Sequence, residues 1–90
     1  MNILESDKLK IRILICLNKQ EEAISLNSLK KQVRAINYRS VQRNCDFLNL
    51  TGLITIKKQR IADITYNMIS ISDNGRDMLE RYDNISNLLT

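Results

Sequence analysis

Apolar and polar residues follow a helical period in the first third of the chain. Between residues 6 and about 20, apolar side chains fall on one face and most basic ones on the other, which predicts an amphipathic helix capped by its first serine. The apolar face consists of Leu9, Ile13, Leu14, Cys16 and Leu17. Residues 23–26 are half β-branched and predict one small strand. A short second helix is predicted over residues 28–34, with Asn27 or Ser28 as its N-cap.

The next segment has a clear amphipathic pattern. Its apolar face is formed by Val41, Cys45 and Leu48, at spacings of four and three residues. Its polar face carries Tyr38, Arg39, Gln42, Arg43 and Asp46. Asn37 can cap the first turn and Gly52 can end the helix in the left-handed conformation, so a helix is predicted over residues 38–51. Only residues 35 and 36 separate the second helix from this cap, which predicts a helix-turn-helix.

After Gly52 the pattern changes to that of strands. Residues 53–58 and 64–71 are rich in Ile, Thr and Tyr, and the polar segment 59–63 separates them, so they predict an antiparallel hairpin. This segment has no Asn-Gly pair, which leaves the type of turn open. Phe47 and Leu50, near the exposed side of the preceding helix, are expected to pack under this hairpin.

A last helix is predicted from a cap at Ser72 or Asp73 to about Leu88, with Gly75 in its first turn. Its apolar residues form a stripe spaced three and four apart, comprising Met78, Leu79, Tyr82, Ile85, Leu88 and Leu89. Such a stripe can belong to the chain's own core or to a dimer interface. We favour the interface, because a helix after the hairpin has only one side of a small domain to pack on.

The predicted class is therefore α+β and mostly helical, in the order helix, short strand, helix, helix, two-stranded wing and C-terminal helix. Residues 48–54 (LNLTGLI) and 71–76 (ISDNGR) resemble the ends of the wing in many prokaryotic winged helix-turn-helix regulators. The chain is most similar to small archaeal proteins of this type that dimerise through a C-terminal coiled-coil helix. The resemblance implies a DNA-binding domain over residues 1–72 and a dimerisation helix over residues 73–90, within one structural unit.

Composition agrees with a polyanionic partner. The chain has 90 residues, with 14 basic against 10 acidic side chains and a net charge of +4. It lacks histidine, the usual general base and metal ligand, so we expect no enzyme, no metal and no cofactor. Cys16 and Cys45 are expected to be buried free thiols, with a disulfide left open. The absence of a long apolar run predicts a cytoplasmic protein that does not enter membranes. If the protein binds DNA, we expect it to be nucleoid-associated.

Candidate contacts follow if the helix over residues 38–51 enters a DNA major groove. The candidates for reading base edges are Tyr38, Arg39, Ser40, Gln42 and Arg43. The candidates for the DNA backbone are Lys30, Lys31 and Arg34 of the second helix, and those for backbone or minor groove are Lys57, Lys58 and Arg60 of the wing. A merely solvated helix face is the alternative, and the capped, basic context after a tight turn argues against it.

Three functions are compatible with these features. The first is a dimeric, double-stranded DNA-binding transcription regulator with a pseudo-palindromic site. The second is a low-specificity archaeal chromatin or nucleoid protein. The third is a winged-helix protein-interaction module without DNA binding.

Overall fold

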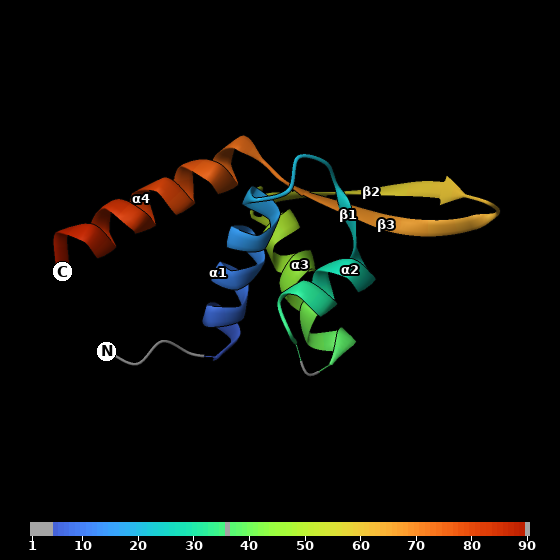
Figure 1. Cartoon of the computed structure of the whole chain (residues 1–90), viewed down its shortest axis with the longest axis horizontal. Coiled ribbons are helices and arrows are strands. Elements are labelled where there is room, and N and C mark those ends of the chain that lie inside the picture. The colour runs from blue at the N-terminus through green and yellow to red at the C-terminus, as the bar shows by residue number, and fades with distance from the viewer. Residues whose placement is uncertain (1–4, 36, 90) are drawn as a thin grey trace.

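The computed structural model describes the backbone of residues 5–35 and 37–89 and the side chains of residues 7–35 and 37–81 (Figure 1). The elements are α1 (Glu5–Asn18), β1 (Ile24–Ser25), α2 (Leu26–Gln32), α3 (Tyr38–Leu50), β2 (Ile54–Ile61), β3 (Ile64–Ile71) and α4 (Asp73–Leu89). This is an α+β chain in the predicted order, so the predicted fold class is confirmed.

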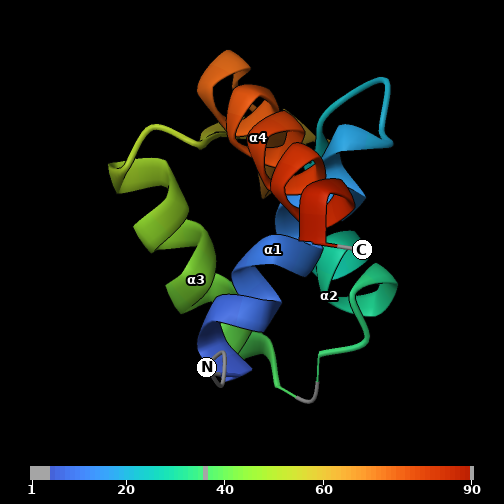
Figure 2. The ribbon, with the colours of Figure 1, turned by 90° about the vertical axis from the view of Figure 1, so that its left-hand side faces the viewer.

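The molecule is elongated, with principal extents of 49 × 26 × 21 Å. The three strands form an antiparallel sheet in the order β1-β3-β2, and α1, α2 and α3 gather at its base. Beyond this base, the β2–β3 hairpin projects in one direction and α4 in the other (Figure 1). Viewed from the α4 side, α3 and α2 flank α1, and α4 crosses above α1 (Figure 2).

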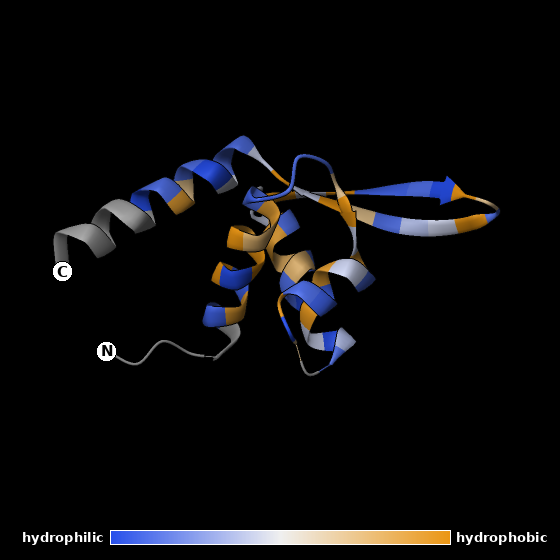
Figure 3. Ribbon diagram, in the orientation of Figure 1, coloured by the Kyte–Doolittle hydropathy of each residue, from blue (hydrophilic) through white to orange (hydrophobic). Residues whose placement is uncertain are grey.

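The core lies where the helices meet the base of the sheet. It takes Ile13 and Leu17 from α1, Leu29 from α2, Val41 and Leu48 from α3, and Ile69 from β3, each at most 1% exposed. Apolar segments of α1, α3 and the sheet base face one another, whereas most of β2 is hydrophilic (Figure 3). The apolar faces predicted for the first and third helices are therefore core faces, although Cys16 is only half-buried.

The second helix begins earlier than predicted. Its N-cap is Ser25, whose Oγ accepts the Ser28 N–H at 3.2 Å, so the prediction of Asn27 or Ser28 as the cap was wrong. An earlier start places Leu26 in the core as a helical residue, which shortens the predicted strand to two residues. Burial of this leucine outweighs the local preference for a cap further along the chain.

The wing is longer than predicted, because β2 continues to Ile61 and pairs it directly with Ile64 of β3. Ala62 and Asp63 form the connection, with φ of 50° and 66°. Two consecutive positive φ angles are typical of the type I′ turn, whose twist suits a two-residue hairpin. Ala62 and Asp63 take the place of the common Asn-Gly pair, and of the two only Asp is enriched at positive φ.

A hydrogen-bonded junction joins the end of α3 to the starts of β2 and α4. Gly52, at φ +79°, donates to the Asn49 carbonyl at 3.1 Å, and Leu53 N–H donates to the Leu48 carbonyl at 2.9 Å, which together make a Schellman ending. Ser72 Oγ donates to the Gly52 carbonyl at 2.6 Å and accepts the Gly75 N–H at 3.1 Å. The two strings singled out in the sequence thus meet in space, and Ser72 caps α4 as one of the two predicted residues.

Gly75 is required by close packing at this junction. A Cβ added there would overlap the Leu53 carbonyl oxygen and lie 2.7 Å from Ile71 Cγ1. We expect Gly75→Ala to lower the free energy of unfolding by about 1–3 kcal/mol, because the Leu53 backbone and the Ile71 side chain must shift. Urea denaturation measures this loss. Asp77→Ala, at an exposed position of the same helix, is the control and should change stability by less than about 0.5 kcal/mol. Equal effects of the two variants would contradict the packing argument.

Candidate nucleic-acid interface

One face of α3 is open to solvent and cationic. Asn37 caps the helix as predicted, with its Oδ1 accepting the Ser40 N–H at 2.7 Å. Because Val41, Cys45 and Leu48 are at most 1% exposed, the helix is held in one rotation about its axis. The side chains of Tyr38, Arg39, Gln42 and Arg43 are consequently exposed. The predicted face is thus accessible.

Ser40 differs from the other four base-contact candidates. Its side chain is half-buried, its N–H is used by the cap, and its carbonyl accepts from Asn44 Nδ2 at 2.7 Å. Asn44 itself is only 7% exposed. Ser40 therefore stabilises the first turn of the helix, and its side chain is less accessible than those of the other four candidates.

The basic residues of the wing lie on both faces of the hairpin. Lys58 and Arg60 continue the face that carries Ile54 and Ile56, and Lys57 points to the opposite face, since side chains alternate along a strand. All three are exposed. Arg60 forms an ion pair with Asp63 across the turn at 3.1 Å, with both side chains largely exposed, so this pair adds little stability.

The basic residues of the second helix differ in exposure. Lys30 is half-buried, whereas Lys31 and Arg34 are exposed. Arg34 follows the helix rather than belonging to it, because α2 ends at Gln32.

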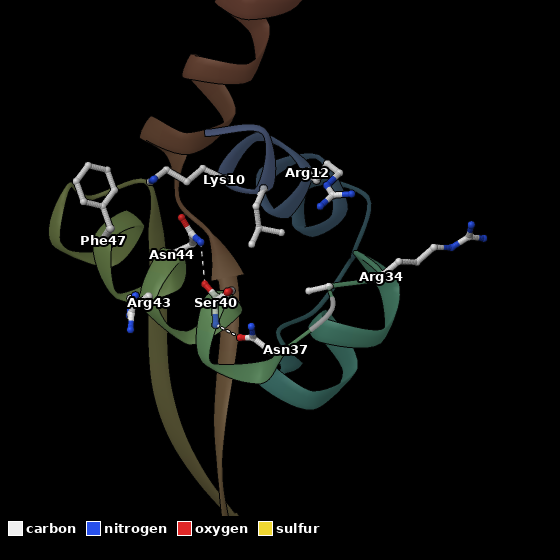
Figure 4. Close-up of a pocket in the computed structure, with 10 residues that line it drawn as sticks. Lys10, Arg12, Arg34, Asn37, Ser40, Arg43, Asn44 and Phe47 are labelled. Carbon is white, nitrogen blue, oxygen red and sulfur yellow. Dashed lines mark hydrogen bonds between the residues drawn. The ribbon is translucent and has the colours of Figure 1, made fainter. Parts of the chain in front are cut away.

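A groove lies between the first half of α1, the α2–α3 turn and α3 (Figure 4). Its volume is about 750 Å³, and it is lined by Leu9, Lys10, Arg12, Arg34, Ala35, Asn37, Ser40, Arg43, Asn44 and Phe47. It brings together three predicted site residues, Arg34, Ser40 and Arg43. The other predicted cations of α2 and of the wing do not line it, namely Lys30, Lys31, Lys57, Lys58 and Arg60. Lys10 and Arg12 were missed by the sequence reasoning, which placed them only on the polar side of a helix.

Phe47 does not pack under the wing, so that expectation was wrong. Phe47 is 51% exposed, and its ring lies beside α1, with the Lys10 ammonium 4.9 Å from the ring centroid. Lys10 also pairs with Asp7 at 3.5 Å. Leu50 is 86% exposed and is likewise not covered by the hairpin. The wing projects away from the base of the sheet and leaves this side of α3 uncovered (Figure 1).

The two cysteines are free and lie in different surroundings. Burial, with a smaller effect of Asp46, raises the pKa of the Cys45 thiol to about 12. Cys16 is half-buried and its thiol donates to Gln32 Oε1 at 3.3 Å, and partial burial raises its pKa. Both thiols therefore stay protonated at neutral pH, which makes them poor nucleophiles.

The described residues contain no group of three His, Cys, Asp or Glu side chains that could hold a metal ion. Within the same residues, none of the helices combines the length and apolar character that crossing a membrane requires.

The apolar stripe of α4 is divided by the structure. Leu79 is 7% exposed and packs into the core of its own chain, so its assignment to a dimer interface is corrected. Met78 is 51% exposed. The side chains of Tyr82, Ile85, Leu88 and Leu89 lie outside the described residues.

No family model matches the chain, and no curated protein matches it. Several solved structures are similar to this chain. A PadR family transcription regulator from Clostridium difficile is 16% identical, with a TM-score of 0.78 over 90% of this chain and 88% of that one. Bacillus subtilis PadR in complex with operator DNA is 18% identical, with a TM-score of 0.73 over 83% of this chain and 46% of that one. A protein of the Sulfolobus islandicus plasmid-virus pSSVx is 21% identical, with a TM-score of 0.63 over 78% and 91% of the two chains.

The fold is the winged helix-turn-helix. In it, α2 and α3 form the helix-turn-helix, and β2 and β3 form the wing.

Arg34 lies in the turn of this helix-turn-helix and has a strained backbone. Its φ is 55°, and the Ala35 and Arg34 N–H groups donate to the Lys30 and Lys31 carbonyls at 3.2 and 3.3 Å, as in a Schellman ending. Glycine is the usual residue at this position, because a Cβ makes the left-handed conformation unfavourable.

We expect Arg34→Gly to raise the free energy of unfolding by about 1 kcal/mol, because glycine relieves this strain. Thermal unfolding measures the change. Lys31→Gly, inside α2, is the matched control and should lower stability by about 1 kcal/mol. If both glycine variants are destabilised, the backbone of Arg34 is not strained.

Proposed function

We propose that this protein is a dimeric, double-stranded DNA-binding transcription regulator that places α3 in the major groove. The observation that carries the proposal is the exposed cationic face of α3, held outward by its buried apolar face. A helix that follows a tight turn and exposes arginines near its N-terminus is suited to contact base edges.

Within this proposal, the exposed side chains of α3 have separate roles. Arg39 or Arg43 donates two hydrogen bonds to a guanine, and Gln42 pairs with an adenine. Tyr38 and Ser40 lie at the start of the helix, from which a side chain can reach either a base or a neighbouring phosphate. Since the five residues span less than two turns of helix, they can contact only a few base pairs.

The remaining cations supply affinity that does not depend on sequence. Lys30, Lys31 and Arg34 contact backbone phosphates beside the major groove, and Lys57, Lys58 and Arg60 contact the backbone or the minor groove through the wing. Each phosphate contact releases counterions, so binding weakens as salt rises. The Bacillus subtilis PadR complex with operator DNA supports this arrangement through its shared fold.

Dimerisation through α4 completes the proposal. This helix projects from the body of the chain (Figure 1). It packs mainly on α1, and Met78 is exposed on it. The proposed interface consists of Met78, Tyr82, Ile85, Leu88 and Leu89. A two-fold dimer presents two copies of α3 to successive turns of DNA, which makes a pseudo-palindromic site the natural target.

Selection of bound DNA from a random duplex pool tests the function. An enriched palindrome supports a regulator, whereas recovery without sequence preference favours a nucleoid protein. Recovery of no DNA favours a protein-interaction module and contradicts the proposal.

We expect Arg39→Ala to weaken binding to the selected site by about 1–3 kcal/mol per protomer and to relax selectivity at one base pair of each half-site, because a bidentate guanine contact is lost there. Fluorescence anisotropy with the selected site and its single-base variants measures both effects. Arg81→Ala removes an exposed arginine of α4 and is the control, with unchanged affinity. Equal affinity of Arg39→Ala and the wild type would argue against base reading by this residue.

We expect Met78→Glu to weaken self-association by at least tenfold, because a carboxylate is costly to bury at an apolar interface. Sedimentation velocity over a concentration series measures the monomer–dimer equilibrium. Glu80→Gln, at an exposed position of the same helix, should leave it unchanged. A wild-type protein that stays monomeric at high concentration would rule out the dimer.

A further inference from the structure

The groove between α1 and α3 is cationic. Among the side chains that the structure describes, its lining includes Lys10, Arg12, Arg34 and Arg43 and no aspartate or glutamate. Lys10 is already engaged by Asp7 and the Phe47 ring. The three arginines form no ion pair with a carboxylate in the part of the chain whose side chains are described. Their charges are therefore not neutralised by these carboxylates.

The arginines stand on opposite sides of the groove. Arg43 extends from the α3 side, whereas Arg12 and Arg34 extend from the α1 side and the α2–α3 turn (Figure 4). A small anion would require guanidinium groups that converge on one point. Guanidinium groups on two separated rims suit several charges along an extended polyanion.

Between the two rims lies the N-terminus of α3. Asn37 and Ser40 line the groove there, and Asn37 uses its Oδ1 to cap the helix, which leaves its Nδ2 able to donate. The positive end of a helix dipole favours phosphate, and α3 is 13 residues long. The groove thus has donors in its middle as well as at its edges.

Two further features connect this groove to DNA. Arg43 belongs both to the rim and to the outer face of α3, so the groove is continuous with the face that reads bases in the proposed function. Arg34 keeps a side chain at a backbone conformation that favours glycine, at φ 55°. Strained residues of this kind cluster at ligand-binding and active sites.

We propose that this groove binds a stretch of DNA backbone beside the major groove, with Arg12 of α1 as a phosphate contact outside the helix-turn-helix. The inference rests on the proposed DNA binding and extends the interface to α1. Arg12 adds affinity without sequence preference, because phosphates carry no base identity.

The experiment compares Arg12→Gln and Arg12→Lys with the wild type on the selected site and on random duplex, over a salt series. We expect Arg12→Gln to weaken binding at least tenfold on both DNAs, since each protomer of the dimer loses a charge-assisted contact. The slope of log affinity against log salt should fall in magnitude by about 0.9 for each lost contact, which is about 1.8 for a dimer. Arg12→Lys should keep the slope because it keeps the charge. Arg81→Gln is the control on α4 and should match the wild type.

The outcomes separate the two proposals. If Arg12→Gln keeps wild-type affinity and salt slope while Arg39→Ala weakens binding, the groove does not contact DNA and the proposed function stands. If the wild type binds neither DNA, both proposals fail. A loss with Arg12→Gln on the selected site alone would assign Arg12 to base reading and overturn its role as a phosphate contact. Thermal unfolding of each variant verifies that the fold is kept.

Discussion

Burial of the apolar face of α3 is the interaction on which the rest of the structure depends. Val41, Cys45 and Leu48 are at most 1% exposed, and they pack with side chains of α1, α2 and the sheet. Because these residues lie on one side of the helix, their burial determines which side faces out. Arg39 and Arg43 are thereby held exposed to solvent. A change in this packing would alter the direction of every candidate base contact.

The junction around Ser72 fixes the directions in which the wing and α4 leave the helical body. Ser72 Oγ donates a hydrogen bond to the Gly52 carbonyl at 2.6 Å. This bond joins the end of α3 to the start of α4, next to the first residues of β2. The wing and α4 therefore leave the body in opposite directions (Figure 1). Gly75 permits the close approach, because a side chain there would meet the Leu53 carbonyl. One small set of backbone contacts thus orients both projections.

Much of the fold could be predicted from local patterns. The cap at Asn37, the stop at Gly52 and the amphipathic period of residues 38–51 were sufficient to place α3 within one residue of its observed end. The boundaries of α2 and β2 were less predictable. Leu26 joins α2 because the core accepts its side chain, and β2 reaches Ile61 because the partner strand continues opposite it. Both boundaries depend on residues distant in the sequence.

The sequence by itself determined that Val41, Cys45 and Leu48 of α3 are buried and that Arg39, Gln42 and Arg43 are exposed, because helical period and apolar burial are local consequences of residue order. Only the tertiary structure decided what stands next to them. It placed Arg12 of α1 and Arg34 of the turn on the groove that Arg43 borders, and it buried Leu79 in the core instead of offering it to a second chain. Neighbours of this kind depend on how helices pack against one another, and the residue spacing along a single helix does not predict that packing.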